Sequence, residues 1–222
     1  MTQYTAHPSA IIDLTAQIGA GTMIGANVVI GPDTIIGVEC DIQAQAVIGA
    51  NPFTKAGQDR PLQAIVIGDR CRIGVGAVIQ NGIARQTTIG VGCWINNLCN
   101  IGHDVQLGDR VVMGLSSSIS GHSTIGAEVR IGPGCTLNNR SDVGARAVVG
   151  IGSLVLHPVA AGTTVMGRPA EERSAHLAQA RALRVAAGQD QTSRQITRGQ
   201  GSRLRRLATH WGRRLWWRIL KR

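Results

Sequence analysis

Residues 30–49 read IGPDTIIGVECDIQAQAVIG, in which an isoleucine returns every six residues and is usually followed by glycine. The same spacing runs without a break from Ile12 to Ile48. It resumes at Ile67 and, after one slip, restarts at Ile83 and continues far into the chain. A fixed period maintained over this length indicates a repeat architecture.

Each six-residue repeat has three positions with a physical role. The first is a bulky apolar residue, which we expect to point into a shared core. The second is glycine in most repeats, which suits a backbone that needs unusual angles or a close approach at every corner. The fifth is small or β-branched, as at Thr22, Ala46 and Ser117. A period of six matches neither the about 2.0 residues of a strand nor the about 3.6 residues of a helix, so we predict a solenoid of short strands.

Three such repeats, or eighteen residues, close one triangular coil, and each coil stacks on the last through backbone hydrogen bonds. Two segments break the period, at residues 50–63 and 80–86. An interrupted period in a solenoid indicates residues looped out from a corner. Such loops usually help to build a binding site, so we predict this role for both segments.

The composition indicates a soluble protein. The 222-residue chain is 43% hydrophobic and 3% aromatic, which fits a slim solenoid core of isoleucine and valine. Its apolar runs stay far below the roughly 18 residues of a membrane-spanning helix. The first ten residues, MTQYTAHPSA, lack the basic start and the apolar stretch of a secretory signal. We therefore expect a soluble, cytoplasmic protein.

The five cysteines all occupy the fifth position of the repeat. Other coils place serine, threonine, alanine or valine at this position, so we predict that the cysteines are small core residues. Their odd number and the absence of a CxxC pair disfavour disulfide, zinc and redox functions and fit a reducing cytoplasm. The cysteines are Cys40, Cys71, Cys93, Cys99 and Cys135.

The net charge of +10 is concentrated at the C-terminal end of the sequence. Residues 201–222 carry eight basic residues, no acidic residue and three tryptophans. Apolar side chains recur there at helical spacing, so we predict a basic amphipathic tail that lies on an anionic membrane surface. Two alternatives are a helix that packs on the protein's own oligomer and a disordered arm. Nucleic acid is a weaker interpretation, because no recognition motif accompanies the arginines.

These patterns divide the chain into four parts. Abundant alanine and arginine, with two acidic residues that complement the helix dipole at the start, predict a helix after the last coil. The expected parts are a β-helix domain at 1–169, a C-terminal helix at 170–187, a polar linker at 188–200 and the basic tail at 201–222.

His103 and Asp104 stand out within the stretch IGHDVQLGD of residues 101–109. They follow a core position by two and three residues, so we expect both to leave the core and project at a corner. Adding eighteen residues moves one coil along the axis, which places Gly121 beside His103 and His122 beside Asp104, with the coils about 4.8 Å apart. Acyl transfer from a thioester needs a base to take the proton of the attacking group, and imidazole suits that task near neutral pH.

The stretches IGHDVQLGD and SISGHSTIG resemble the active-site segment of the hexapeptide-repeat acyltransferases, in particular the UDP-N-acetylglucosamine acyltransferases and the nucleotide-aminosugar N-acetyltransferases. The resemblance implies an all-β solenoid, a left-handed parallel β-helix over residues 7–170, followed by C-terminal helices. It also implies that His103 is the general base, that Asp104 orients it, and that Gly121 N–H binds the thioester oxyanion. By the same resemblance His122 contacts the acceptor or the donor.

Three positions depart from these families. Asn100 and Asn138 stand where the UDP-N-acetylglucosamine acyltransferases carry further histidines, and we assign both to substrate binding. Val112 stands where the aminosugar N-acetyltransferases typically carry a second histidine. The resemblance therefore implies a sugar or nucleotide-sugar acceptor, of the kind used in polysaccharide biosynthesis, without naming it. The choice between N- and O-acylation and the acyl chain length stay open.

The sequence GRPA at residues 167–170 resembles the turn that closes the β-helix in many acetyl-CoA-dependent members of this superfamily. It implies acetyl-CoA or another acyl-CoA as the donor. We expect this donor to lie along the coils toward Gly150, Gly152, Gly167 and Pro169. The family places its active sites between neighbouring subunits, so a homotrimer is implied, and no metal is expected.

Three other functions remain open. One is an acyl-carrier-protein-dependent acyltransferase of the lipid A type. Another is a gamma-class carbonic anhydrase, which shares the β-helix but binds zinc through three histidines, a set that His103 and His122 alone do not complete. The third is a non-catalytic β-helix scaffold. For the enzyme we expect a cytoplasmic location, including the inner face of the membrane.

Overall fold

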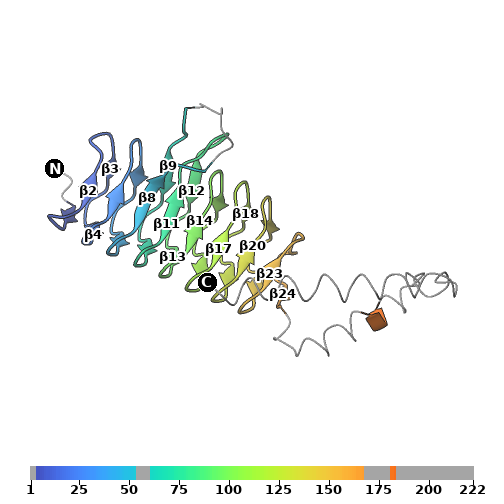
Figure 1. Ribbon diagram of the computed structural model, residues 1–222. Coiled ribbons are helices and arrows are strands. Elements are labelled where there is room, and N and C mark those ends of the chain that lie inside the picture. The colour runs from blue at the N-terminus through green and yellow to red at the C-terminus, as the bar shows by residue number, and fades with distance from the viewer. Residues whose placement is uncertain (1–3, 54–60, 168–180, 184–222) are drawn as a thin grey trace, which may run out of the picture. The chain divides into compact units, whose positions relative to one another are not determined.

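The computed structural model describes residues 4–53, 61–167 and 181–183. The chain divides into two compact units, Met1–Arg168 and Pro169–Arg222. The described part of the first unit is a solenoid of short strands, whose coils follow one another along one axis (Figure 1).

The strands form three parallel sheets, in which each strand pairs with the strand one coil before it and the strand one coil after it. Sheet 1 contains nine strands: β1 (Thr5–Ala6), β4 (Met23–Ile24), β7 (Asp41–Ile42), β10 (Arg72–Ile73), β13 (Trp94–Ile95), β16 (Val112–Met113), β19 (Arg130–Ile131), β22 (Val148–Val149) and β24 (Thr164–Val165). Sheet 2 contains eight: β2 (Ile11–Ile12), β5 (Val29–Ile30), β8 (Val47–Ala50), β11 (Val78–Gln80), β14 (Asn100–Ile101), β17 (Ser118–Ile119), β20 (Thr136–Leu137) and β23 (Leu154–Val155). Sheet 3 contains seven: β3 (Gln17–Ile18), β6 (Ile35–Ile36), β9 (Ile65–Ile67), β12 (Thr87–Ile89), β15 (Gln106–Leu107), β18 (Thr124–Ile125) and β21 (Asp142–Val143).

The register of these sheets confirms the predicted eighteen-residue coil. Asn100 pairs with Ser118 and Ile101 pairs with Ile119, so each partner lies eighteen residues further along the chain. One coil therefore takes one strand from each sheet and turns three corners. The described coils form a left-handed parallel β-helix, in which the repeat predicts the solenoid and the resemblance implies its left-handed course.

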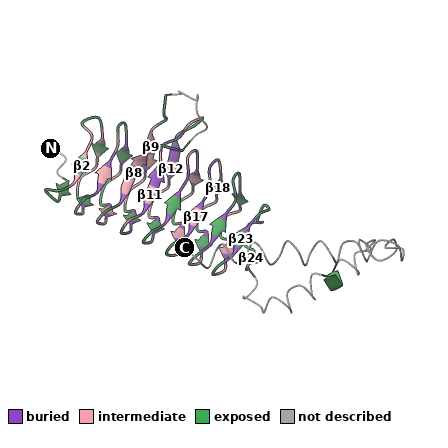
Figure 2. Cartoon of the chain, viewed as in Figure 1, coloured by how far each residue is buried: buried purple, intermediate pink, exposed green. Residues whose placement is uncertain are grey.

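The first and fifth positions of the repeat build the core. Ile30 and Ile101 are almost completely buried, and the inward-facing residues appear in purple along the strands in Figure 2. Burying one such side chain stabilises the fold by about 1.5–3 kcal/mol. All five cysteines are buried and free, which confirms that they are core residues. The fifth-position groups also bond the corners, since Ser117 Oγ donates to Gly132 O at 2.8 Å.

The glycines at the second position of the repeat are required by close approach between coils. A Cβ atom on Gly108 would lie 2.6 Å from the backbone nitrogen of Ala127 in the next coil. The left-handed backbone conformation belongs mainly to the fourth position, where Asp104 has a φ of 61° and Gly134 a φ of 66°, and Gly49 is the described second-position glycine that also has a positive φ, of 99°. Of the two reasons expected for the second-position glycine, close approach is therefore the general one, and an unusual backbone angle applies at Gly49.

The two breaks in the repeat are loops at the same edge of the solenoid. The first connects β8 to β9 and the second connects β11 to β12, both from sheet 2 to sheet 3. Backbone bonds between Gln63 and Gly82, of 2.9 and 3.2 Å, join the two loops. Ile83, where the repeat was expected to restart, lies half-buried in the second loop, and the register restarts at Ile89.

Little of the predicted C-terminal organisation falls within the described residues. Of the helix expected at 170–187, residues 181–183 are described, and they are helical. The linker at 188–200 and the tail at 201–222 lie outside the described residues. No helix in the described part of the chain is long and apolar enough to span a membrane.

Candidate active site

The candidate site lies at the corner between sheets 2 and 3, directly after the two loops. His103 and Asp104 follow β14, and Gly121 and His122 follow β17, the next strand of the same sheet. His122 N–H donates to His103 O at 2.9 Å across the two coils. The predicted stacking of the two corners is therefore confirmed.

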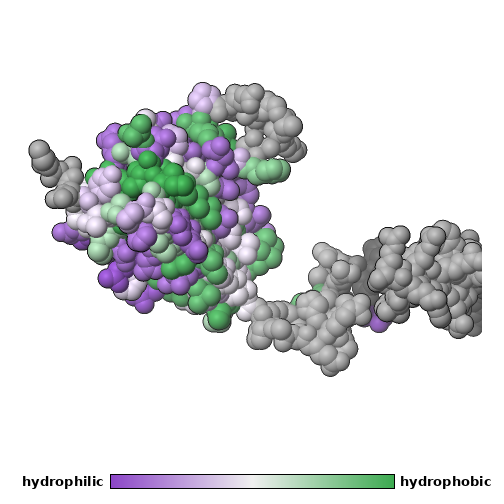
Figure 3. Space-filling view, turned by 60° about the vertical axis from the view of Figure 1, so that its left-hand side comes forward, coloured by the Kyte–Doolittle hydropathy of each residue, from purple (hydrophilic) through white to green (hydrophobic). Residues whose placement is uncertain are grey.

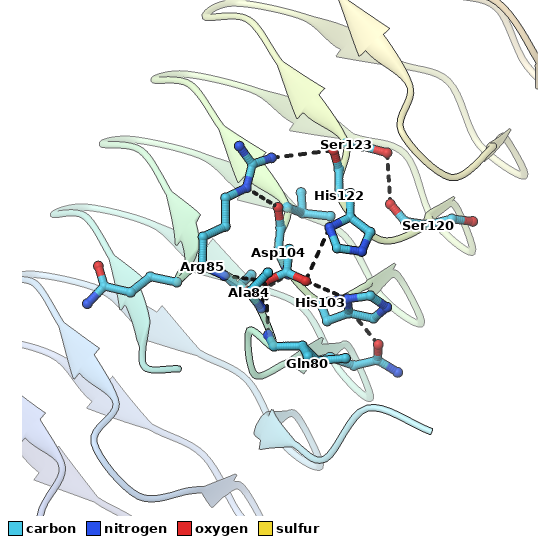
Figure 4. A network of polar contacts seen from close by, with 12 residues as sticks. Gln80, Ala84, Arg85, His103, Asp104, Ser120, His122 and Ser123 are labelled. Carbon is cyan, nitrogen blue, oxygen red and sulfur yellow. Dashed lines mark hydrogen bonds and ion pairs between the residues drawn. The ribbon is translucent and has the colours of Figure 1, made fainter. Parts of the chain in front are cut away.

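One carboxylate oxygen binds both imidazoles (Figure 4). Nδ1 of His103 lies 2.8 Å from Oδ2 of Asp104, and Nδ1 of His122 lies 3.3 Å from the same oxygen. The two rings are perpendicular, with an interplanar angle of 89° and a centroid distance of 4.8 Å. The first contact is a hydrogen bond and the second is a longer approach, so the carboxylate orients His103 and lies close to His122.

The prediction that Asp104 projects from the corner is wrong, because its side chain is 0% exposed. The second loop covers it. Oδ1 of Asp104 accepts hydrogen bonds from the backbone N–H groups of Ile83, Ala84 and Arg85, at 2.9, 2.8 and 2.7 Å. The loop therefore replaces solvent around this carboxylate. His103 does reach the surface, with 24% of its side chain exposed.

Asp104 is charged despite its burial. Burial alone would raise its pKa, but the hydrogen bonds from Arg85 N–H, from the His103 side chain and from Ile83 and Ala84 N–H lower the pKa to about 2. A carboxylate in this state only accepts hydrogen bonds. Nδ1 of His103 must therefore carry the hydrogen, which leaves its Nε2 with a free lone pair. This is the arrangement that a general base requires.

His122 is held in its neutral form. Burial lowers the pKa of its imidazole, the nearby Asp104 charge raises it, and the positive charges of Arg140 and Arg85, together with that of His103 whenever it is protonated, lower it again. The direction of the shift is downward from the ordinary value of 6.5. At neutral pH the site therefore holds two imidazoles around one negative charge, with His122 uncharged.

Gly121 makes room for the His103 ring. It is buried, and a Cβ atom built on it would lie 2.7 Å from Cε1 and Nε2 of His103. The ring therefore lies directly against the Gly121 backbone. Within the described residues no acceptor is bonded to Gly121 N–H.

The remaining predicted residues lie further from the two imidazoles. Asn100 is exposed on the outer face of β14, and Asn138 is exposed at the same edge of the solenoid, one coil beyond Gly121. Gly150 and Gly152 lie at a different corner, between sheets 1 and 2.

Gly167 joins that other corner, since its N–H donates to Ser153 Oγ at 2.6 Å. Pro169 lies outside the described residues. The structure thus brings together His103, Asp104, Gly121 and His122, and it places the glycines assigned to the donor along another edge of the same solenoid.

Three residues that support the site were missed by the sequence interpretation. His103 N–H donates to Gln80 Oε1 at 3.2 Å, and Asp104 N–H donates to Thr87 Oγ1 at 3.0 Å. Arg85 Nε donates to the carbonyl oxygen of Asp104 at 2.8 Å. The only signal for them in the sequence is the slip of the repeat just before the His-Asp pair.

His103, Asp104 and His122 are also the residues that could hold a metal ion, since their ligand atoms lie within 4.8 Å of one another. Both Nδ1 atoms already face Oδ2 of the carboxylate, and Oδ1 accepts three backbone hydrogen bonds. An ion would have to replace the imidazole N–H bonds. The observed bonding therefore fits a carboxylate-oriented base more closely than a metal centre.

The six-residue repeat, the left-handed β-helix and the His-Asp corner together define a member of the hexapeptide-repeat acyltransferase superfamily. Residues 6–116 match the family model described as the GMPPB C-terminal domain. These 111 residues are half of the 222-residue chain, and the chain belongs to this family.

Known proteins of similar sequence and structure carry acyltransferase names. UDP-3-O-acylglucosamine N-acyltransferase 2 of Rhodopseudomonas palustris (strain BisB18) is 32% identical over 148 residues, which are 67% of this chain and 39% of the relative. The enzyme UDP-3-O-acylglucosamine N-acyltransferase of Caulobacter sp. (strain K31) is 32% identical over 135 residues, which are 58% of this chain and 40% of the relative. The matched segment thus spans about two fifths of these relatives.

Among solved structures, the UDP-N-acetylglucosamine O-acyltransferase of Moraxella catarrhalis RH4 superposes with a TM-score of 0.60 at 28% identity. The superposition covers 81% of this chain and 83% of that chain. The share of the chain that superposes agrees with a β-helix that runs through most of the described residues.

Proposed function

We propose that this protein is an acyltransferase that moves an acyl group from a thioester to an amine or hydroxyl group of a nucleotide sugar. The observation that carries the proposal is the 2.8 Å contact between His103 Nδ1 and the buried Asp104 carboxylate, because it leaves Nε2 of His103 as a base. The names of the curated relatives support acyl transfer and favour an amine on a UDP-sugar as the acceptor.

In this mechanism the acceptor amine or hydroxyl attacks the carbonyl carbon of the thioester while Nε2 of His103 takes its proton. The carbonyl oxygen becomes an oxyanion, for which Gly121 N–H is the candidate donor. The Asp104 carboxylate stabilises the imidazolium that forms. As the intermediate collapses, the carbon–sulfur bond breaks and the thiolate takes the proton from His103. The acylated sugar and the free thiol then leave a neutral imidazole.

The identity of the acyl donor is less well determined than that of the acceptor. The GRPA turn supports acetyl-CoA or another acyl-CoA, whereas the names of the relatives support the lipid A type of enzyme, for which an acyl carrier protein is the expected donor. Gly150 and His103 lie at different corners of the solenoid. A donor that contacts both would extend across the outer face of sheet 2 or between two subunits.

We further propose that the protein works as a homotrimer. A three-sided solenoid offers flat sheet faces for symmetric association. Sheet 2 exposes apolar side chains on its two end strands, Ile11 at 67% and Leu154 at 61%, while Asn100 and Thr136 are exposed polar residues on strands between them. Figure 3 shows a continuous hydrophobic area, in green, on one face of the molecule. Exposed apolar area of this kind supports burial against another subunit.

For location, we propose the cytoplasm, with attachment to the inner face of the membrane through residues 201–222. The support comes from composition, since this segment combines eight basic residues with three tryptophans and no acidic residue. Such a segment is attracted to anionic lipid headgroups and places its aromatic rings at the interface.

The test is a screen of nucleotide-aminosugars against acyl-CoA and acyl carrier protein donors, read by mass spectrometry. The His103→Ala variant should lose roughly 100- to 10,000-fold of the activity found, because general base catalysis contributes about that factor. His7→Ala is the matched control, since His7 is exposed and lies far along the chain from the site. Full activity in His103→Ala would reject the mechanism.

The same preparation separates the other functions. Bound zinc together with CO2 hydration that is lost in His103→Ala would replace acyl transfer by the carbonic anhydrase activity. No reaction with any donor and no zinc would support a scaffold. A strong preference for acyl carrier protein over acyl-CoA would assign the lipid A type of donor and reject the acyl-CoA assignment.

A further inference from the structure

The second loop contacts the candidate site through its backbone and through the side chains of Gln80 and Arg85. Its backbone N–H groups at residues 83–85 hold Oδ1 of Asp104 at 2.7 to 2.9 Å. A carboxylate fixed at one oxygen cannot rotate about its Cβ–Cγ bond. Oδ2 is therefore held in one place, where both imidazole Nδ1 atoms reach it.

The Arg85 side chain links the two stacked corners from the loop side (Figure 4). Nε donates to Asp104 O at 2.8 Å, and Nη2 lies 3.4 Å from His122 O. Both carbonyls belong to residues in the left-handed conformation, with φ of 61° at Asp104 and 62° at His122. The orientation of each carbonyl follows from that conformation. One guanidinium group therefore contacts the turn at both corners.

No other corner of the described solenoid has a loop side chain bonded to the carbonyls of two successive left-handed residues. The backbone bond between successive coils is common to this corner and the others, since His122 N–H donates to His103 O at 2.9 Å and Glu128 N–H donates to Asp109 O at 2.8 Å. Arg110 provides the nearest comparison, since its guanidinium bonds the exposed Glu128 carboxylate one coil away at 2.6 Å. The Arg110–Glu128 pair joins two side chains and does not involve the backbone carbonyls of the turns.

We propose that Arg85 is a positioning residue, which fixes the turns of Asp104 and His122 so that both imidazoles share Oδ2 of one carboxylate. Its effect on catalysis rests on the proposed function, whereas its effect on the imidazoles does not. Arg85 acts through the two corner carbonyls and through Asp104, and it is not assigned a contact with substrate.

Charge alone is the competing explanation for any effect of Arg85. The charged and titratable groups that face His122 are the Asp104 carboxylate, the His103 imidazole and the guanidinium groups of Arg85 and Arg140. An Arg85→Lys variant keeps the positive charge but loses the planar fork that bonds two carbonyls. An Arg85→Gln variant loses both. If positioning is correct, the two variants behave alike.

The first measurement is the tautomer of each imidazole, from NMR spectra of protein labelled with 15N histidine at neutral pH and without substrate. The unmodified protein should show hydrogen on Nδ1 of both His103 and His122. In Arg85→Gln and Arg85→Lys the His122 signal should change to a mixture of tautomers. Arg110→Gln is the matched control, because it removes an exposed arginine that also links two coils, and it should leave both imidazoles unchanged.

The second measurement is steady-state acyl transfer. Both Arg85 variants should lower kcat by roughly 10- to 100-fold, the scale expected when reacting groups are misplaced by about 1 Å, with little change in KM for the acceptor. Arg110→Gln should retain full kcat. Circular dichroism confirms folding, and Arg85→Lys carries the test if Arg85→Gln does not fold.

Three outcomes would overturn the inference. Unchanged tautomers in both variants would show that the turns hold without Arg85. A rise in KM with unchanged kcat would make Arg85 a substrate-binding residue. Full rescue by Arg85→Lys would assign the effect to charge. Absence of acyl transfer in the unmodified protein would reject the proposed function, while the NMR result would still decide the role of Arg85.

Discussion

At the scale of single residues, the site depends on how Asp104 stays charged inside the protein. A buried carboxylate without partners would take up a proton. Three backbone N–H groups on one oxygen and two imidazoles at the other compensate for lost solvent. The charge of Asp104 then selects the Nδ1–H tautomer of His103. The buried carboxylate therefore determines that Nε2 is the basic nitrogen of the ring.

The first prediction concerns Asp104→Asn and the dependence of stability on pH. The folded pKa of about 2 lies below the ordinary value of 3.8, so the charged form contributes stability that is complete above about pH 4 and is lost as the pH falls through about 2. The difference corresponds to about 2 kcal/mol. We expect Asp104→Asn to be less stable than the unmodified protein by about that amount at pH 7.

The measurement is chemical denaturation at pH 7 and near pH 2.5, for the unmodified protein and for Asp104→Asn. The difference in unfolding free energy should shrink at the lower pH, because both proteins then lack the full charge. Asp142→Asn serves as the control, since Asp142 is exposed on β21. An equal difference at both pH values would contradict the bonding described for Asp104.

The sequence was sufficient to predict which residues of the site stack on one another. An eighteen-residue step places Gly121 beside His103 and His122 beside Asp104, and the strand register confirms it. The burial of Asp104 could not be predicted in this way. The burial of Asp104 depends on the loop before β12, whose residues do not follow the six-residue period. The period therefore cannot predict which residue this loop covers.

At the scale of the repeat element, glycine has two separate functions that the sequence pattern does not distinguish. At the second position of the repeat it allows neighbouring backbones to approach, as at Gly108. At the fourth position it occupies a left-handed turn that thirteen non-glycine residues in the described part of the chain also adopt. Only the first function is a steric requirement, because arginine, glutamate and leucine are among the residues accepted in the second.

The second prediction compares Gly108→Ala with Gly134→Asn by thermal and chemical denaturation. A Cβ on Gly108 would meet backbone atoms of the next coil at 2.6 to 2.9 Å, and backbone cannot move aside as a side chain can. We expect Gly108→Ala to destabilise the protein by about 1–3 kcal/mol, the usual cost of overpacking.

Gly134→Asn is the matched variant. Gly134 has a φ of 66°, and a Cβ atom on it would have no heavy atom of another part of the chain within 4 Å. Asparagine adopts the left-handed conformation readily. The stability of this variant should stay within about 0.5 kcal/mol of the unmodified protein. Equal destabilisation by the two substitutions would show that backbone conformation, rather than close approach, selects the glycines.

At the scale of the whole molecule, the sequence predicted the architecture because one short period repeats through most of the chain. Each coil repeats the same burial pattern, so one correct assignment at Ile30 extends to the other coils. The predicted donor contacts can be checked against the same period. Gly150 lies 47 residues after His103, which is not a whole number of eighteen-residue coils, so the period already places the two residues at different corners, and the strand order confirms it.

The third prediction concerns residues 201–222, which lie outside the described residues. Deleting them should abolish co-sedimentation with vesicles that contain anionic lipid, because each basic residue near such a surface contributes about 1 kcal/mol. Vesicles of neutral lipid are the control and should bind weakly in either case. Acyl transfer to a soluble acceptor should be unchanged by the deletion. Equal sedimentation of the full and shortened chains would reject the membrane role.

The stacking of the site across consecutive coils restricts how the length of the protein can change. The corner that holds the candidate site is assembled from the second loop, the coil of His103 and the coil of Gly121, which together span residues 80–123. A whole coil added or removed elsewhere would preserve every contact in that span. A coil inserted between His103 and Gly121 would separate the imidazole from the glycine that accommodates it. Related chains can therefore differ by multiples of eighteen residues on either side of this span and keep the same chemistry.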